Sequence, residues 1–198
     1  MSEKVTPYKD SKASKKEQVA TMFDTISGHY DGLNRVISFG IDVQWRNKVV
    51  KLVSETKPKT ILDVATGTGD LAINLVRTGA TEIIGLDISA GMLEVGKEKV
   101  SDKKLDNTIK MVLGDGEKID YPDNHFDAIT VSFGVRNFEY LEQGLSEIYR
   151  VLKPSGIFVV LETSVPTKTP FKQGYHFYTG NILPVSYTHL TLPTIYSV

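Results

Sequence analysis

Short apolar segments alternate with amphipathic segments between residues 60 and 161, and this alternation constrains the fold more than any other feature of the chain. Strand-like segments occupy residues 60–64, 82–87, 108–113, 125–132 and 157–161. Helical spacing predicts helices over residues 70–78, 89–100 and 140–152. Apolar strands separated by helices indicate a parallel sheet that is covered on both faces. The predicted fold class is therefore α/β, Rossmann-like, with a mostly parallel sheet and helices on both faces.

The N-terminal part has a different pattern. Residues 1–14 are polar and are expected to form a mobile arm. The next apolar residues have the spacing of one helix face: Val19, Met22, Phe23 and Ile26. We expect Gly28 to end that helix, residues 29–40 to form a loop, and Asp42 to cap a second helix that ends before Pro58.

Residues 186–198 break with everything before them, since they carry no charged residue and place Pro193 inside a β-prone stretch. We expect a non-native tail, such as a fusion scar, with an irregular native tail as the alternative. The predicted organisation is an arm over residues 1–14, a C-terminally truncated domain over 15–185, and this tail.

Composition excludes several classes of protein. The 198 residues are enough for one domain with a sizeable core, and a net charge of -1 argues against a nucleic-acid binder. The absence of cysteine rules out disulfides, thiolate metal sites and a cysteine nucleophile, and we expect no metal. There is no apolar run of the ~20 residues that a membrane span needs, and no secretory signal, so a cytoplasmic location is expected.

The turn after the first strand, residues 63–70, reads Asp-Val-Ala-Thr-Gly-Thr-Gly-Asp. Open α/β sheets bind ligands at the carboxyl ends of their strands, and glycines there let the backbone approach a ligand closely. The glycine spacing is compatible with a dinucleotide fingerprint, but Asp70 at the helix N-terminus would repel a diphosphate. Asp63 adds a second acid, so the turn favours a cationic ligand, S-adenosylmethionine, over a nicotinamide dinucleotide.

Three further strand ends complete the predicted cofactor site. Asp87 could accept hydrogen bonds from both ribose hydroxyls, with a helix cap as the alternative role. Asp115 and the Gly116 backbone could meet the adenine edge, or form an ordinary Asp turn. Ser132 would line the floor, or be a satisfied hydroxyl. The predicted cofactor-binding residues are Asp63, Gly67, Thr68, Gly69, Asp87, Asp115, Gly116 and Ser132.

Four blocks of this sequence carry a joint pattern: the segment from Tyr30 to Trp45, the turn around residues 62–71 with Asp87, residues 132–137 (Ser-Phe-Gly-Val-Arg-Asn), and residues 150–164. Together they resemble the ubiquinone/menaquinone biosynthesis C-methyltransferase family. The resemblance covers residues 15–185 and looks most like menaquinone-type members. Leu33, Asp42 and Ser155 depart from the usual Met, His and Gly, and family members continue past residue 184 with a last helix and two strands.

The resemblance implies methyl transfer from S-adenosylmethionine to a ring carbon of a polyprenylated quinol, with demethylmenaquinol as the expected acceptor. A benzoquinol of ubiquinone biosynthesis and an inactive cofactor-binding remnant are the alternatives. Arg136 and Asn137 are the predicted catalytic residues, because an arginine stays protonated and can stabilise a developing phenolate. His29, Tyr30 and Asp31 are candidate proton acceptors.

The long apolar tail of such a substrate also implies peripheral membrane contact. Aromatic residues that could provide it are Phe171, Tyr175, Phe177 and Tyr178. Weak attraction to anionic lipid could come from the basic residues Lys4, Lys9, Lys12, Lys15 and Lys16.

Overall fold

A computed structural model of the protein describes residues 12–38, 40–162 and 173. The chain divides into two compact units, Met1–Glu162 and Thr163–Val198. The fold below belongs to the first unit. The predicted tail, the boundary at residue 185 and the aromatic residues at 171–178 lie outside the described residues, as does most of the predicted arm.

The core of the first unit is a five-stranded parallel sheet in the order β3-β2-β1-β4-β5. Its strands are β1 (Thr60–Val64), β2 (Glu82–Asp87), β3 (Ile109–Leu113), β4 (Phe126–Ser132) and β5 (Leu152–Leu161). The central strand β1 pairs with both β2 and β4, so the strand order reverses beside it. The predicted α/β class is confirmed, and ligand binding is expected at this reversal.

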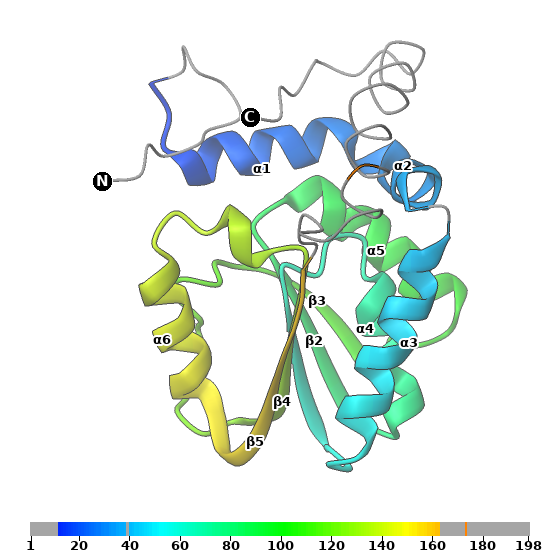
Figure 1. The fold of residues 1–198 in the computed structure, drawn as a ribbon, viewed down its shortest axis with the longest axis vertical. Coiled ribbons are helices and arrows are strands. Elements are labelled where there is room, and N and C mark those ends of the chain that lie inside the picture. Colours follow the sequence, from blue (N-terminus) through cyan, green and yellow to red (C-terminus); the bar gives the residue numbers. More distant parts are fainter. Residues whose placement is uncertain (1–11, 39, 163–172, 174–198) are drawn as a thin grey trace. The chain divides into compact units, whose positions relative to one another are not determined.

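Helices cover both faces of the sheet. One face carries α3 (Ile41–Ser54), α4 (Asp70–Leu75) and α5 (Ala90–Asp102), and the other carries α6 (Leu141–Val151) (Figure 1). Successive side chains of a strand point to opposite faces, so Ile61 joins the core under the first set of helices and Leu62 the core under α6. This explains why neighbouring residues in the middle of the strands are both apolar.

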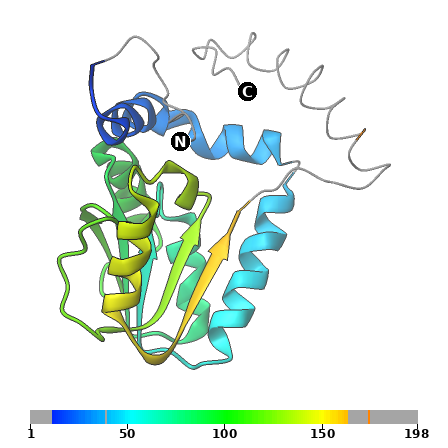
Figure 2. The ribbon, with the colours of Figure 1, turned by 60° about the vertical axis from the view of Figure 1, so that its left-hand side comes forward.

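Two further helices lie above the carboxyl ends of the strands. They are α1 (Lys15–Ile26) and α2 (Tyr30–Ile37), separated by a short 3-10 turn over Ser27–His29 (Figure 2). A capping box begins α1: the Ser14 hydroxyl accepts the Glu17 N–H at 3.2 Å, and the Glu17 carboxylate accepts the Ser14 N–H at 2.8 Å. The first helix is confirmed as predicted.

The loop predicted over residues 29–40 is wrong, because most of it forms α2. Gly32 and Asn34 are poor helix formers, so the local sequence did not predict a helix here. Most of the stability of a short helix comes from its packing against the rest of the chain. The predicted cap at Asp42 is also wrong: Gly40, with φ +75°, precedes α3, and Asp42 lies in its first turn. The Asp42 carboxylate instead accepts the Ser38 hydroxyl and pairs with Arg46.

The fifth strand begins at Leu152, five residues earlier than predicted. The pairing of β4 with β5 is irregular over residues 153–156. Phe126 pairs with Leu152 while Ala128 pairs with Ile157, and Ser155 has φ +67°. The extra residues are absorbed as a bulge. Among the described residues, no helix is long and apolar enough to cross a membrane.

Candidate functional site

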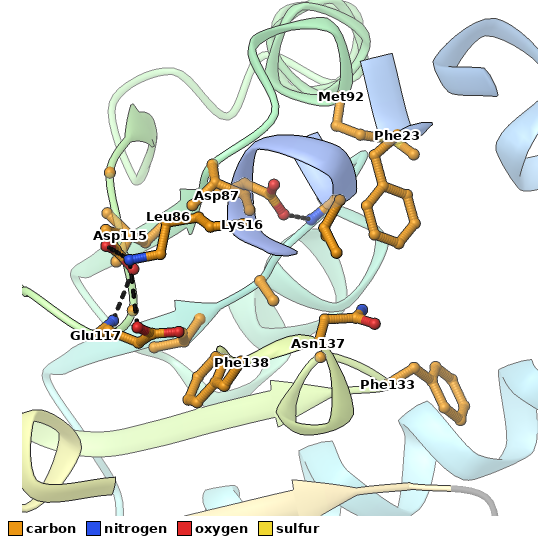
Figure 3. A pocket seen from close by; sticks show the side chains of 18 of the residues that line it. Lys16, Phe23, Leu86, Asp87, Met92, Asp115, Glu117, Phe133, Asn137 and Phe138 are labelled. Atoms are coloured by element: carbon orange, nitrogen blue, oxygen red, sulfur yellow. Dashed lines mark hydrogen bonds and ion pairs between the residues drawn. The ribbon is translucent and has the colours of Figure 1, made fainter. Parts of the chain in front are cut away.

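A cavity of about 660 Å³, counting its open mouth, lies at the carboxyl ends of β1 to β4 (Figure 3). Its walls come from the turns after the four strands, from the loop that precedes α6, and from α1 and α2. The turns provide the base of the cavity and α1 provides a cover.

The turn after β1 has two glycines in the left-handed region, Gly67 at φ +58° and Gly69 at φ +77°. Gly67 lines the cavity and its N–H donates to Asp87 Oδ2 at 2.8 Å. Gly69 precedes α4, where a Cβ would lie 3.1 Å from Met111 Cε. The Thr68 hydroxyl points to Asp31, to which it donates at 2.5 Å. Of these predicted residues, only Gly67 reaches the cavity wall.

Asp87 lines the cavity and is held by backbone donors. Its Oδ2 accepts the Gly67 N–H, and its Oδ1 accepts the Ser89 N–H at 2.9 Å. Burial raises the pKa of Asp87 above its ordinary value, although the N–H donors from Ser89 and Gly67 oppose this. A carboxylate oxygen can accept more than one hydrogen bond, so Asp87 can hold a ligand hydroxyl in addition to these donors. Ser89 itself caps α5, as predicted, by accepting the Met92 N–H at 3.1 Å.

The turn after β3 brings Asp115, Gly116 and Glu117 to the cavity. A Cβ on Gly116 would lie 2.8 Å from Val64 Cγ1 and 3.1 Å from Phe138 Cζ, so a side chain there would have to displace its neighbours. Asp115 Oδ1 accepts the Glu117 N–H at 2.9 Å. Its Oδ2 accepts a hydrogen bond from the ammonium of Lys16, a residue of α1 (Figure 3).

Lys16 joins two carboxylates at this point. Its Nζ lies 2.5 Å from Asp115 Oδ2 and 3.2 Å from Glu117 Oε2. Burial by itself would lower the pKa of Lys16, but hydrogen bonds to Asp115 and Glu117 raise it overall, so the ammonium stays charged. Glu117 is 2% exposed, and its Oε1 accepts the Glu139 N–H at 2.6 Å.

The end of β4 supplies Ser132, Phe133, Gly134 and Asn137 to the cavity, whereas Arg136 does not line it. Gly134 packs against Ala65, where a Cβ would lie only 2.4 Å from the Ala65 Cβ. Phe133 adopts φ +57°, a strained conformation of the kind that clusters at functional sites.

Arg136 lies just outside, with a side chain that is 58% exposed. Its guanidinium carbon is 6.0 Å from the Phe133 ring centre, and Nη1 is 3.6 Å from Glu162 Oε2. It therefore stands at the margin of the cavity, on the side of Phe133.

Asp63 does not face the cavity. It is 1% exposed, and its carboxylate accepts the hydroxyls of Thr66 and Thr130 at 2.6 Å each. Burial raises its pKa to about 6, against the opposing hydrogen bonds. Because β1 is the central strand, this side chain is enclosed by its neighbours, and the carboxylate supports the turn from behind.

Asp70 is also turned away from the cavity. Its carboxylate pairs with Arg46 Nη1 at 2.9 Å and with the Lys99 ammonium. The expectation that it opposes a diphosphate at the helix N-terminus therefore has no support in this geometry, since two cations neutralise it. The acids that do face the cavity come from the second and third strand ends.

The sequence analysis did not place Lys16, Val19 or Phe23 at this site, yet all three line the cavity, as does Tyr30, which was predicted as a candidate proton acceptor. Val19 and Phe23 were recognised as part of an apolar helix face. Nothing local indicated that this face covers a ligand site, because the surface that it meets is formed by strand ends far along the chain. Glu117 and Phe138 were missed for the same reason.

The charged groups of the cavity indicate what it can hold. Among the described residues that line it, the charged ones are three carboxylates, of Asp87, Asp115 and Glu117, and one cation, Lys16. The carboxylates are acceptors for hydroxyl and amine donors and attract positive charge. The arrangement suits a ligand with an amine, a diol and a positive centre, and it lacks the cations that a phosphate needs. S-adenosylmethionine has those groups and fits the residues present.

Comparison with known proteins gave a match to the model of the ubiE/COQ5 methyltransferase family over residues 11–191. Demethylmenaquinone methyltransferase of Porphyromonas gingivalis is 45% identical over 185 residues, which are 92% of this chain and 75% of that protein. The ubiquinone/menaquinone biosynthesis C-methyltransferase UbiE of Geotalea daltonii is 48% identical over 173 residues, covering 86% of this chain and 74% of its own length.

Two solved structures share the fold at lower identity. YcgJ of Bacillus subtilis superposes with a TM-score of 0.59 at 24% identity, over 69% of this chain and 57% of that chain. The [4+2]-cyclase SpnF gives 0.61 at 24% identity, over 73% and 59%. These likenesses show the fold alone, and a cyclase among them illustrates that one fold supports different chemistry.

Proposed function

Because this chain belongs to the ubiE/COQ5 methyltransferase family, it is an S-adenosylmethionine-dependent C-methyltransferase of quinone biosynthesis, and we propose that its acceptor is demethylmenaquinol. Relatives at 45% and 46% identity carry the name demethylmenaquinone methyltransferase. The observation that carries the proposal is the cavity with three carboxylates and one cation, at the reversal of strand order, in a chain of this family.

The cofactor site is proposed as follows. Asp87 accepts the ribose hydroxyls, with its carboxylate already oriented by the Gly67 and Ser89 N–H groups. Asp115 and the Gly116 backbone take the adenine edge. Gly67 and Ser132 line the floor. Asp63, Thr68 and Gly69 shape the turn from outside the cavity.

The cofactor supplies a methyl group that its positive sulfur has already activated. The chain must then align the acceptor carbon with that methyl group and exclude water. Val19 and Phe23 on α1 give the cover an apolar inner surface. The acceptor must be the reduced quinol, since the ring carbon of a quinone is electrophilic and does not attack a methyl donor.

The phenolic proton passes to solvent, which makes the ring carbon electron-rich and leaves negative charge on the hydroxyl oxygen. When the ring carbon has taken the methyl group from the sulfur, loss of the proton on that carbon restores the aromatic ring, and the oxygen is protonated again. Arg136 at the cavity margin stabilises that charge, and Asn137 in the wall orients the ring. Burial raises the pKa of Tyr30, so its phenol stays protonated and is suited to donate a hydrogen bond rather than to act as a base. The Asp31 carboxylate is engaged by Thr68 and Lys99.

The polyprenyl tail of the acceptor supports peripheral membrane contact as part of this proposal, because such a tail resides in an apolar phase. Two of the basic residues that could attract anionic lipid, Lys15 and Lys16, contact other parts of the chain. Lys15 Nζ donates to the carbonyls of Arg136 and Phe138 at 3.0 and 2.8 Å, and Lys16 binds the cavity carboxylates. Co-sedimentation with anionic and neutral vesicles measures whether the chain binds the surface.

The test of the activity is single-turnover methylation of a short-tailed demethylnaphthoquinol kept reduced with dithionite. We expect a methylated naphthoquinol by mass spectrometry, with equimolar S-adenosylhomocysteine. The oxidised quinone should give no product. Methylation of a benzoquinol alone would assign the ubiquinone-type acceptor, and methylation of neither would contradict the proposal.

Arg136→Ala tests the catalytic assignment. The variant should bind S-adenosylhomocysteine as the wild type does and lose roughly 10²-fold in single-turnover rate, since the guanidinium acts mainly in the transition state. Arg77→Ala, at an exposed arginine bound to Asn47, is the matched control and should keep the full rate. A normal rate in Arg136→Ala would contradict the assignment.

A further inference from the structure

The strongest unexplained feature of the cavity is the position of Lys16. Its ammonium stands between Asp115 Oδ2 and Glu117 Oε2, at 2.5 and 3.2 Å (Figure 3). Lys16 is 99 residues away from Asp115 in sequence, so the contact is made only when α1 covers the strand ends. The proposed activity assigns no role to Lys16 or to Glu117.

Glu117 holds a second carboxylate beside that of Asp115. Its side chain is 3% exposed, and one oxygen, Oε1, is satisfied by the Glu139 N–H. The other oxygen, Oε2, is buried and is in contact with the Lys16 ammonium at 3.2 Å. If Lys16 moved away, Oε2 would be a buried carboxylate oxygen without a partner, which is costly unless another donor takes the place of the ammonium.

The Lys16 ammonium and the exocyclic amine of adenine can bind the same two carboxylate oxygens. In both groups the nitrogen only donates hydrogen bonds, and it has enough N–H groups to donate one to each carboxylate. The Asp115–Glu117 pair lies next to the Gly116 backbone, at the end of the cavity proposed for adenine. Lys16 therefore occupies the place that the exocyclic amine of adenine would take.

We propose that Asp115 and Glu117 form a two-carboxylate subsite for the adenine amine, and that Lys16 is its internal occupant, which the cofactor displaces on binding. This inference rests on the proposed cofactor site. It gives Lys16 two effects: the residue closes α1 over the empty cavity, and it lowers the affinity for every ligand that carries the amine.

The inference also predicts discrimination between purines. A deaminated cofactor has a carbonyl at the position of the amine, and a carbonyl accepts hydrogen bonds. The carbonyl oxygen would repel the carboxylate oxygens of Asp115 and Glu117, because all of them are acceptors. The Lys16 ammonium is a donor that could bind the carbonyl and the carboxylates together. Removing the Lys16 charge should therefore raise the affinity for the adenine ligand and lower the affinity for the deaminated ligand.

Calorimetric titration of the full chain with S-adenosylhomocysteine and with S-inosylhomocysteine measures both effects. Lys16→Met, which keeps the aliphatic stem, should bind the adenine ligand about 3- to 10-fold more tightly than the wild type, given the strength of partly exposed ion pairs. It should bind the inosine ligand more weakly. Lys16→Arg should restore wild-type behaviour, and Lys110→Met, at an exposed lysine paired with Glu82, should change neither affinity.

Equal or weaker binding of S-adenosylhomocysteine by Lys16→Met would overturn the inference while leaving the cofactor site intact. If the wild type and all variants failed to bind it, the cofactor site and the inference would both be overturned.

A second measurement uses the wild-type chain and so does not depend on a variant that folds. Amine-reactive labelling read by mass spectrometry compares Lys16 with Lys110, with and without ligand. Ligands usually protect lysines in a site, but here S-adenosylhomocysteine should increase the labelling rate of Lys16 several-fold and leave Lys110 unchanged. Protection of Lys16 by S-adenosylhomocysteine would overturn the displacement.

Discussion

Two acidic residues at the ends of neighbouring strands have different surroundings and, we propose, different tasks. Asp87 faces the cavity and is oriented by backbone N–H groups. Asp63 is enclosed and accepts only the hydroxyls of Thr66 and Thr130 in the described structure. Asp87 ends β2 and Asp63 is the residue before the last of β1, so the direction of the side chain decides which carboxylate is available to a ligand.

Asp87→Ala removes a charged acceptor and leaves the Gly67 and Ser89 N–H groups without a partner. We expect affinity for S-adenosylhomocysteine to fall roughly 30- to 1,000-fold, which corresponds to about 2–4 kcal/mol. Calorimetric titration measures it, with Asp106→Ala at an exposed position as the control. Unchanged affinity would disprove the proposed role of Asp87.

Asp63 makes the free energy of unfolding depend on pH in a defined direction. Its pKa is raised by burial to about 6 in the folded chain, from 3.8, so between these values the folded state binds more protons than the unfolded state. The contribution of Asp63 to stability is therefore fully present below about pH 4 and is lost as the pH rises to about 6, by at most about 3 kcal/mol.

Asp63→Asn should remove this pH dependence, because a neutral amide keeps the contacts with the two threonines. Urea unfolding at pH 4.5 and pH 7 gives the comparison: the stability of the variant relative to the wild type should rise between the two values. Asp127, whose pKa is lowered in the folded state, serves as a contrast, since its contribution is lost as the pH falls. A constant difference between variant and wild type would contradict the prediction.

At the scale of elements, a network of ion pairs joins the helices beside the cavity. Arg46 on α3 pairs with Asp42 of the same helix at 2.8 Å and with Asp70 on α4 at 2.9 Å. Lys99 on α5 pairs with Asp70 and with Asp31 on α2. The network holds α2, which is short and contains poor helix formers, in place above the strand ends. It thereby positions Tyr30 at the cavity wall.

Arg46→Met should cost about 3–5 kcal/mol of stability, because Asp42 is 3% exposed and would be left as a buried charge without its partner. Replacing both residues, with Asp42→Leu added to Arg46→Met, should cost less than the single change, since both buried charges are then gone. Urea unfolding of the two variants measures this. A double variant less stable than Arg46→Met would argue against the account.

At the scale of the whole molecule, β5 ends the described part of the sheet. It pairs with β4, and its other edge pairs with no described strand. Val160 in this strand is 45% exposed. An apolar edge strand is a template for pairing with another chain.

Val160→Lys should therefore reduce self-association, because a charge on an edge strand disfavours strand addition. Sedimentation velocity over a range of concentrations measures the association. Val43→Lys, at a valine of α3 with 40% exposure, is the matched control and should behave as the wild type. Equal association of the two variants and the wild type would show that β5 is not the surface involved.

The strands, the helices that cover the sheet and the edge of the sheet at which the cavity lies could all be predicted from the sequence. Local apolar spacing decides whether a segment is a strand or a helix, and parallel strands bring their carboxyl ends to one edge. The residues following those ends, among them Asp87, Asp115 and Asn137, therefore line the cavity as expected.

Only the tertiary structure decided which side chains at that edge face the cavity and what covers it. Asp63 is turned away from the cavity by its hydrogen bonds with two threonines, and Asp70 by its ion pairs with Arg46 and Lys99. Lys16 contacts Asp115, which is 99 residues away in the sequence. The helicity of α2 was likewise hidden, because contacts with other helices outweigh its weak local propensity. Such choices depend on partners that are distant in sequence, and a local pattern carries no information about them.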